Sequence, residues 1–168
     1  RGSENNVLDR VSNAAKYLNA NIIVEITGDC PLIDPDLVDS AIEVFLKNYP
    51  TNKYVGNTGS IPAGFDVQVF MAKDLYEINE SETDELDREH VSYKFYRPES
   101  KNIYNPLFVK YNKELNRPEI FVTLDFLEDY NLIKKIYEAL FPINNNFTVL
   151  DVIKWLDKNP EIRDSAKK

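Results

Sequence analysis

The sequence predicts an α/β fold with a mostly parallel sheet that is mixed at one edge, and three observations predict it. Segments with the apolar spacing of helices alternate with short runs rich in Val and Ile. Residues 21–27, NIIVEIT, are apolar on both faces except at Glu25, which is typical of a central, buried strand. The 168 residues are 43% hydrophobic and 29% charged, enough to bury one core.

The expected helices and strands follow from the spacing of apolar residues and from residues that begin or end helices. Apolar residues recur at helical spacing across 6–18, and residues 21–27 form the strand described above. Asp34 and Pro35 then read as the N-cap and first position of a helix. The remaining elements are strands at 53–57 and 65–70, helices at 72–80 and 82–98, strands at 105–112 and 118–125, and helices at 126–141 and 148–162. We expect one domain over residues 1–160 and a frayed tail over 161–168.

The composition excludes several classes of partner. The net charge of −8 repels a phosphate backbone, so we expect no nucleic-acid partner. No stretch approaches the roughly 20 apolar residues of a membrane span, so we expect no membrane insertion. The opening residues, RGSENN, do not resemble a secretion signal, and we therefore expect a cytoplasmic protein.

The single cysteine and single histidine restrict the chemistry further. Cys30 alone cannot form an intramolecular disulfide, and it reads most simply as a small buried hydrophobe. His90 alone cannot build a His-rich metal site. Any metal ion is therefore expected to be Mg²⁺ or Mn²⁺, held by the oxygens of Asp or Glu.

Two aspartates follow predicted strands, where ligands gather in open α/β sheets. Asp29 comes directly after the first strand, and it is either a turn residue beside Gly28 or a ligand. Asp125 is either the N-cap of the next helix, in a capping box with Glu128, or a second ligand. If both are ligands, they can share one divalent cation together with substrate phosphates.

Two further groups are candidates for substrate binding. Asn57, Gly64 and Asp66 lie in the loop and strand between residues 57 and 70, which can equally be an ordinary connection. Arg88 and His90 lie on the predicted helix at 82–98, where a lone histidine is more often structural than catalytic.

A phosphate-binding glycine loop is not present in the sequence. The glycines, at positions 2, 28, 56, 59 and 64, match neither GxGxxG nor GxxxxGK spacing. The first element is a helix, whereas a doubly wound domain usually begins with a strand and its phosphate loop. We expect the fold to lack that N-terminal strand and loop.

Five segments occur in an order that identifies a resemblance. They are RGSENNVLDRV, ITGDCPLIDPDLVD, GFDVQVF, REHVSYKFYR and VTLDFLEDYNLIKKIYEAL. Together they resemble the cytidylyltransferase family of the spore coat polysaccharide protein SpsF, which is related to the CMP-Kdo and CMP-acylneuraminate synthetases. The resemblance covers residues 1 to about 160. It implies a Rossmann-like, three-layer α/β/α nucleotide-diphospho-sugar transferase fold.

The resemblance also implies a reaction. Family members transfer CMP from CTP to an acidic sugar or similar acceptor and release pyrophosphate, in surface polysaccharide biosynthesis. A homodimer is a possible assembly. Because the family opens with a strand and a phosphate-binding loop, this chain looks like the C-terminal two-thirds of such a domain and is expected to be inactive alone. The alternatives are a non-catalytic nucleotide- or partner-binding fragment, and a glycosyltransferase of similar fold, although the sequence GDCP lacks an Asp-x-Asp motif.

Residue roles carry over by position. Asp29 and Asp125 match the two catalytic aspartates that bind the metal, although LDFLED stands where the family usually reads VDTPED. The residues that match positions near the acceptor are Gly64, Asp66, Arg88, Glu89 and His90, with Asn57 also expected to bind substrate. The residues that match the nucleotide-proximal segment are Arg1, Ser3 and Arg10.

Overall fold

The computed structural model describes residues 2–81 and 84–165, which group into two compact units. The first unit comprises Arg1–Glu25, Ser40–Gly56 and Gln68–Phe108, and the second comprises Ile26–Asp39, Asn57–Val67 and Val109–Lys168. The chain enters each unit three times, so the single stretch expected as one domain contributes to both.

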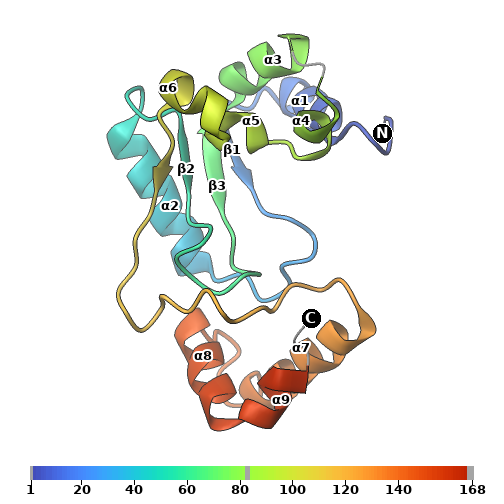
Figure 1. The fold of residues 1–168 in the computed structure, drawn as a ribbon, viewed down its shortest axis with the longest axis vertical. Coiled ribbons are helices and arrows are strands. Elements are labelled where there is room, and N and C mark those ends of the chain that lie inside the picture. Colours follow the sequence, from blue (N-terminus) through green and yellow to red (C-terminus); the bar gives the residue numbers. More distant parts are fainter. Residues whose placement is uncertain (1, 82–83, 166–168) are drawn as a thin grey trace. The chain divides into compact units, whose positions relative to one another are not determined.

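The first unit contains a mixed four-stranded sheet (Figure 1). Its strands are β1 (Ile22–Glu25), β2 (Tyr54–Gly56), β3 (Gln68–Met71) and β4 (Leu107–Phe108), in the order β1-β3-β2-β4. β3 is antiparallel to both β1 and β2, whereas β2 and β4 are parallel. β1, β2 and β4 therefore run in one direction and β3 runs in the opposite one, so the sheet is mostly parallel in strand direction. The antiparallel strand lies inside the sheet and not at the predicted edge.

The position of β1 also corrects a prediction. Its residues are all half-buried, and among the described strands β1 pairs only with β3, so it is an edge strand. The apolar run was expected to be central. The apolar character of both faces indicates that the two faces of the strand are covered. It does not indicate whether a further strand pairs with each of its two edges.

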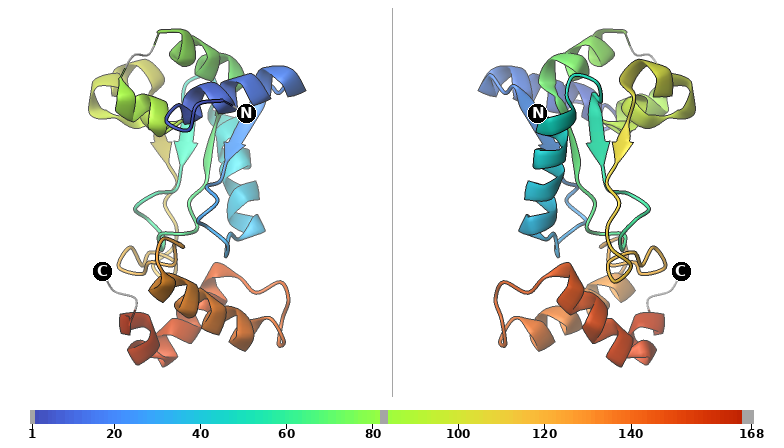
Figure 2. Two further views of the ribbon diagram at one scale, coloured as in Figure 1. Left: turned by 90° about the vertical axis from the view of Figure 1, so that its right-hand side faces the viewer. Right: turned by 90° about the vertical axis from the view of Figure 1, so that its left-hand side faces the viewer.

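Besides part of α2 (Pro35–Asn48), the first unit contains several helices that gather beyond one end of the strands (Figure 1). They are α1 (Val7–Leu18), α3 (Ala72–Ser81), α4 (Glu85–Glu89), α5 (Tyr93–Tyr96), the 3₁₀ turn η1 (Pro98–Ser100) and α6 (Lys101–Tyr104). α1 packs beside α3, as Figure 2 shows. The buried core of the unit consists of Leu8, Tyr54, Phe70, Leu75, Ile78, Val91 and Phe95.

The long helix predicted for residues 82–98 is instead two short helices, within the part of that range that the structure describes. Asp84 caps α4 by accepting the N–H of Leu86 at 2.9 Å, and His90 ends the helix in an extended conformation. Val91 is only 4% exposed and belongs to the core. Burying Val91 turns the chain out of the helical path, a tertiary effect that helical spacing does not report.

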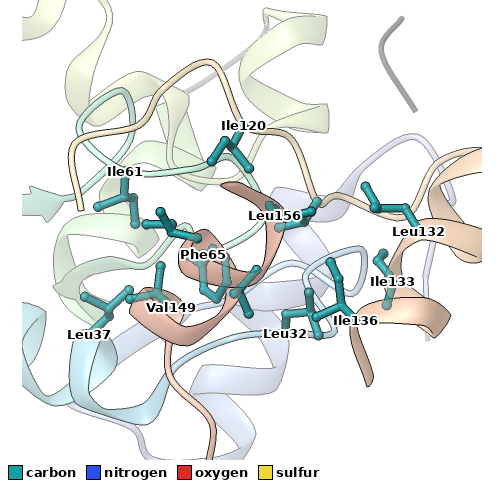
Figure 3. Packing of buried hydrophobic residues seen from close by; sticks show 13 residues of the cluster. Leu32, Leu37, Ile61, Phe65, Ile120, Leu132, Ile133, Ile136, Val149 and Leu156 are labelled. Carbon is teal, nitrogen blue, oxygen red and sulfur yellow. The ribbon is translucent and has the colours of Figure 1, made fainter. Parts of the chain in front are cut away.

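The second unit is built from helices around loops (Figure 3). Its helices are α7 (Leu127–Leu140), α8 (Val149–Lys158) and α9 (Pro160–Ser165), and α2 (Pro35–Asn48) begins in it. Their inner faces pack on loop residues that include Leu32, Ile61, Phe65 and Ile120. Residues of loops therefore pack with a larger number of helical residues to form this core.

Two C-terminal expectations change. The strand predicted at 118–125 is an extended segment with one isolated parallel bridge, between Ala63 and Phe121. The tail expected to fray from residue 161 is helical in α9 up to Ser165, and residues 166–168 lie outside the described part of the chain. Within the described residues, no helix combines the length and the apolar character that crossing a membrane requires.

Candidate functional site

Asp29 lies in a tight turn after β1. The N–H of Cys30 donates to the carbonyl of Thr27 at 3.2 Å, which closes a turn with Gly28 and Asp29 at its centre. The Cys30 thiol lies 3.2 Å from the hydroxyl of Thr27 and donates weakly to Oδ1 of Asp29 at 3.6 Å. The carboxylate of Asp29 is half-buried and is not used as a helix cap.

A backbone hydrogen bond brings the two predicted metal ligands onto neighbouring segments. The N–H of Leu124 donates to the carbonyl of Asp29 at 2.9 Å, and Asp125 is the next residue. Asp125 is exposed, and its Oδ2 accepts the hydroxyl of Thr123 at 3.2 Å. The two aspartates are 96 positions apart in the sequence, and this hydrogen bond joins the segments that carry them within the second unit.

The capping interpretation of Asp125 is wrong. The N-cap of α7 is Phe126, and the carboxylate that reaches back belongs to Asp129. Oδ2 of Asp129 accepts the N–H of Asp125 at 3.1 Å and that of Phe126 at 2.9 Å. Because a buried carboxylate one turn into the helix caps the helix, the Asp125 side chain is not needed for that role.

Gly64 and Asp66 lie beside the same segments. Ala63 exchanges backbone hydrogen bonds with Ile120 and Val122, at 3.0 and 2.9 Å. Gly64 has φ +104°, and a Cβ atom there would lie 2.8 Å from the backbone C and O of Val122. The absence of a side chain at Gly64 therefore permits a close approach of the chain to itself. Oδ2 of the half-buried Asp66 accepts the N–H of Gly64 at 3.0 Å.

Asn57, which is predicted to bind substrate, holds backbone groups of its own unit. Its side chain is fully buried, Nδ2 donates to the carbonyl of Phe65 at 3.0 Å, and Oδ1 accepts the N–H of Val67 at 2.8 Å. Both ends of the amide therefore hold the backbone around Asp66 in place.

The charge around Cys30 shows that this region is negative. Burial raises the pKa of the Cys30 thiol, a hydrogen bond with Thr27 opposes that shift, and the charges of Asp29 and Asp66 raise the pKa further. The thiol is therefore protonated at neutral pH. Cys30 is only 5% exposed, which agrees with its prediction as a small buried hydrophobe.

The donor set determines which metal these residues fit. Within residues 2–81 and 84–165, no group of three or more His, Cys, Asp or Glu side chains is arranged to hold a metal ion. Asp29 and Asp125 offer two hard carboxylates, a set that suits Mg²⁺ when phosphate and water complete the coordination. It does not suit a closed structural Zn²⁺ site.

Arg88, Glu89 and His90 belong to the first unit. Arg88 is half-buried on α4, and Glu89 and His90 are exposed at its C-terminal end. On the inner side of α4, the fully buried Asp87 pairs with Arg97 and lies 3.7 Å from Nζ of Lys94. This ion pair anchors α4, so the exposed residues are presented from a fixed element.

The nucleotide-proximal candidates also lie in the first unit. Arg10 is half-buried on α1, and its Nη2 donates to the carbonyl of Glu4 at 3.4 Å. Ser3 is exposed, and its carbonyl accepts the N–H of Asn6 at 3.4 Å. Arg1 lies outside the described residues.

The sequence interpretation missed two polar groups. Asp34, assigned only as a cap of α2, also accepts the N–H of Val149 at 2.8 Å. Glu25 was noted only as the exception in an apolar strand, and its Oε2 is buried without a hydrogen-bond partner. A lone charge in an apolar run was the signal that could have singled out Glu25.

Comparisons with known proteins identify the family to which the chain is similar. Residues 1–149 match the family model described as cytidylyltransferase. The chain is 34% identical, over 98% of its length, to the uncharacterized protein MJ1063 of Methanocaldococcus jannaschii. It is 28% identical, over 96% of its length, to the spore coat polysaccharide biosynthesis protein SpsF of Bacillus subtilis. It spans 65% of the length of each of these two relatives.

A solved structure supports the same relationship. A cytidylyltransferase from Leptospira borgpetersenii serovar Hardjo-bovis superposes with a TM-score of 0.84 at 28% identity. The match covers all of this chain and 68% of that one. The predicted α/β nucleotidyltransferase fold is thereby confirmed.

Proposed function

Because the chain belongs to the cytidylyltransferase family, we propose that the protein transfers CMP from CTP to an oxygen of an acidic sugar or similar small acceptor, in glycan biosynthesis. The acceptor oxygen forms a bond to the α-phosphorus, the bond to pyrophosphate breaks, and the acceptor's proton is lost. The observation that supports the proposal is the backbone hydrogen bond from Leu124 to Asp29, since it joins the segments that carry the two sequence-predicted carboxylates.

Asp29 and Asp125 are the residues that would hold a divalent cation, Mg²⁺ or Mn²⁺. When bound, such an ion supplies charge neutralisation at the phosphates and orients them. The negative surroundings of Cys30 support this assignment, because a region that carries Asp29 and Asp66 repels a triphosphate unless a cation offsets its charge.

The remaining candidate residues are proposed to handle the organic parts of the substrates. Arg88 and His90 are the basic groups on and beside α4 that would orient an anionic acceptor, with Glu89 beside them. Ser3 and Arg10 would lie near the nucleotide. Positioning accounts for most of the rate enhancement in such a transfer, since no covalent intermediate is required.

Calorimetry tests the proposed nucleotide and metal binding. CTP is titrated with and without Mg²⁺ into the wild type, Asp29→Asn, and the control Asp36→Asn, which removes an exposed carboxylate in the first turn of α2. We expect Mg²⁺-dependent binding that weakens about tenfold or more in Asp29→Asn and stays within about twofold in Asp36→Asn. Binding that ignores Mg²⁺, or equal effects of both variants, would contradict the metal assignment.

Turnover tests the reaction. Pyrophosphate release from CTP is followed with a panel of acidic sugars, for this chain and for a version extended to the length of the relatives. Turnover by the extended version that is lost in Asp29→Asn supports the proposal. CTP binding without turnover supports a non-catalytic nucleotide-binding module, and hydrolysis or transfer from nucleotide sugars supports a glycosyltransferase.

A second copy of the chain is the proposed protein partner. On the outer side of α7, positions 127, 130, 134 and 137 and the C-cap 141 follow alternating spacings of three and four, which is the pattern of a helix–helix contact. Four of these five side chains are apolar, namely Leu127, Tyr130, Tyr137 and Phe141, which are 69, 51, 41 and 48% exposed. The one charged member of the pattern, Lys134, lies 3.8 Å from Glu138, so the face carries one charge of each sign and is compatible with a copy of itself.

A further inference from the structure

A cavity of about 310 Å³ lies within the second unit, between the C-terminal end of α7, the loop that follows it and α8. Its volume is at the lower end of the range of small-molecule sites in proteins. The described residues that line it all come from the segment 140–158, so it is a different place from the one that carries Asp29 and Asp125.

Four apolar side chains line this cavity, and the fold holds them in place. Leu140, Phe147 and Trp155 pack against the buried core of the second unit. The ring of Phe147 also meets that of Tyr137 edge-on, with the ring centroids 5.3 Å apart. The fourth side chain, Ile143, is 84% exposed, and its N–H donates to the carbonyl of Leu140 at 3.0 Å. An apolar ligand that covered these walls would remove apolar surface from water, which is favourable.

Two lysines supply positive charge at the same cavity. Lys154 and Lys158 are exposed and lie one turn apart on α8, where like charges repel each other. The chain has 28 acidic and only 20 basic residues. Nevertheless, within the part of the chain that the structure describes, neither lysine forms an ion pair. An anion bound between the two ammonium groups would offset their repulsion.

The carboxylates of α8 are already used elsewhere. Oδ2 of Asp151, which also lines the cavity, accepts the N–H and the hydroxyl of Thr148 at 2.9 and 3.0 Å. Asp157 forms a two-pronged ion pair with Arg117, at 2.7 and 2.8 Å. The positive charge of the two lysines is therefore left for a ligand from solution.

We propose that this cavity binds a small amphiphilic carboxylate, of the kind represented by a medium-chain fatty acid. Its apolar chain lies against Ile143, Phe147 and Trp155, and its carboxylate accepts charge-assisted hydrogen bonds from Lys154 and Lys158. A neutral sugar would leave the two ammonium groups without a counter-charge, and a nucleoside triphosphate would place polar groups against four apolar walls. This binding is independent of the proposed cytidylyl transfer.

Trp155 reports the binding, because it is the only tryptophan of the sequence and it lines the cavity. Its fluorescence is followed while hexanoate, octanoate or octan-1-ol is titrated into the full chain. We expect octanoate to bind about tenfold or more tighter than hexanoate, since each buried methylene strengthens binding by about fourfold. We also expect octanoate to bind about fivefold tighter than octan-1-ol, because only the carboxylate pairs with the lysines.

Three outcomes of this titration would overturn the proposal. They are the absence of a fluorescence change, affinity that does not depend on chain length, and binding of octan-1-ol that is as tight as that of octanoate. No nucleotide or metal ion is present, so failure here is distinguishable from failure of the proposed cytidylyl transfer.

A pair of double variants tests the two lysines. Lys154→Gln with Lys158→Gln is expected to weaken octanoate binding about tenfold and to change octan-1-ol binding by less than about twofold. The control, Lys110→Gln with Lys113→Gln, removes the same charge at two exposed residues outside the cavity lining and is expected to leave octanoate binding unchanged. Equal weakening in both double variants would reduce the effect to net charge and would contradict a site between Lys154 and Lys158.

Discussion

The carboxylate of Asp34 accepts N–H groups at the starts of two helices, α2 and α8, and the group in α8 is that of Val149. Oδ2 of Asp34 accepts the N–H of Val149, the first residue of α8, at 2.8 Å, while its Oδ1 accepts the N–H of Asp36 in α2 at 2.9 Å. Asp34 is only 4% exposed and Val149 only 3%. The cap of α2 joins residues two positions apart, whereas the bond to Val149 joins residues 115 positions apart.

We expect Asp34→Ala to lower the free energy of unfolding by about 2–4 kcal/mol, because it removes two caps and leaves a buried N–H without an acceptor. Chemical denaturation measures the change. Asp36→Ala is the matched control, since it removes an exposed first-turn carboxylate and is expected to cost less than about 1 kcal/mol. Equal losses in the two variants would show that the contact with Val149 contributes nothing.

Gly64→Ala is expected to destabilise the second unit by more than about 2 kcal/mol. The new Cβ would combine a left-handed φ of +104° with a 2.8 Å approach to the backbone of Val122. Gly59→Ala separates these two causes, because Gly59 has φ +80° and open space around its Cβ position. It is expected to cost only about 1 kcal/mol. If both variants unfold at the same denaturant concentration, the contact with Val122 is not restrictive.

The pH dependence of Cys30 alkylation tests the negative region around Asp29. Burial and the charges of Asp29 and Asp66 raise the thiol pKa, so the thiolate forms only at a pH above the usual range. Asp66→Asn removes one negative charge, lowers that pKa, and is expected to increase the iodoacetamide reaction rate at pH 8 by about twofold or more. Glu161→Gln, a change of charge on α9, is the control. An unchanged profile in Asp66→Asn would place Asp66 too far away to act.

Local spacing was sufficient for the elements whose ends depend on neighbouring residues. The helix predicted over 6–18 is observed at Val7–Leu18, with Asn6 accepting the N–H of Asp9 as its cap. Likewise Asp34 and Pro35 correctly mark the start of α2. In these cases the decisive contacts are within three residues, so the sequence contains them.

The predictions that failed depended on distant contacts. Asp129, and not Asp125, caps α7, because the extended segment bound to Asp29 continues through Leu124 and delays the helix by one residue. The break at His90 follows from burial of Val91 in the core. The hydrogen bonds of Asn57 with Phe65 and Val67 could likewise not be read from spacing. For the candidate site, spacing identified Asp29 and Asp125, whereas only the fold revealed the unpartnered oxygen of Glu25.

The exposed face of α7 predicts self-association. Tyr130 is 51% exposed in the middle of the apolar pattern, so Tyr130→Glu places a charge in the proposed contact at little cost to the folded monomer. Lys135→Glu is the matched control, since Lys135 is an exposed residue of α7 outside the pattern.

We expect analytical ultracentrifugation to give a dimer for the wild type and Lys135→Glu, and a dissociation constant at least about tenfold weaker for Tyr130→Glu. The expected reason is burial of an unpaired carboxylate against the partner's apolar side chains. A monomeric wild type would refute the second copy as the occupant of this face. A dimer unaffected by Tyr130→Glu would move the interface away from α7, because no packed contact between two such helices can bury that charge without loss.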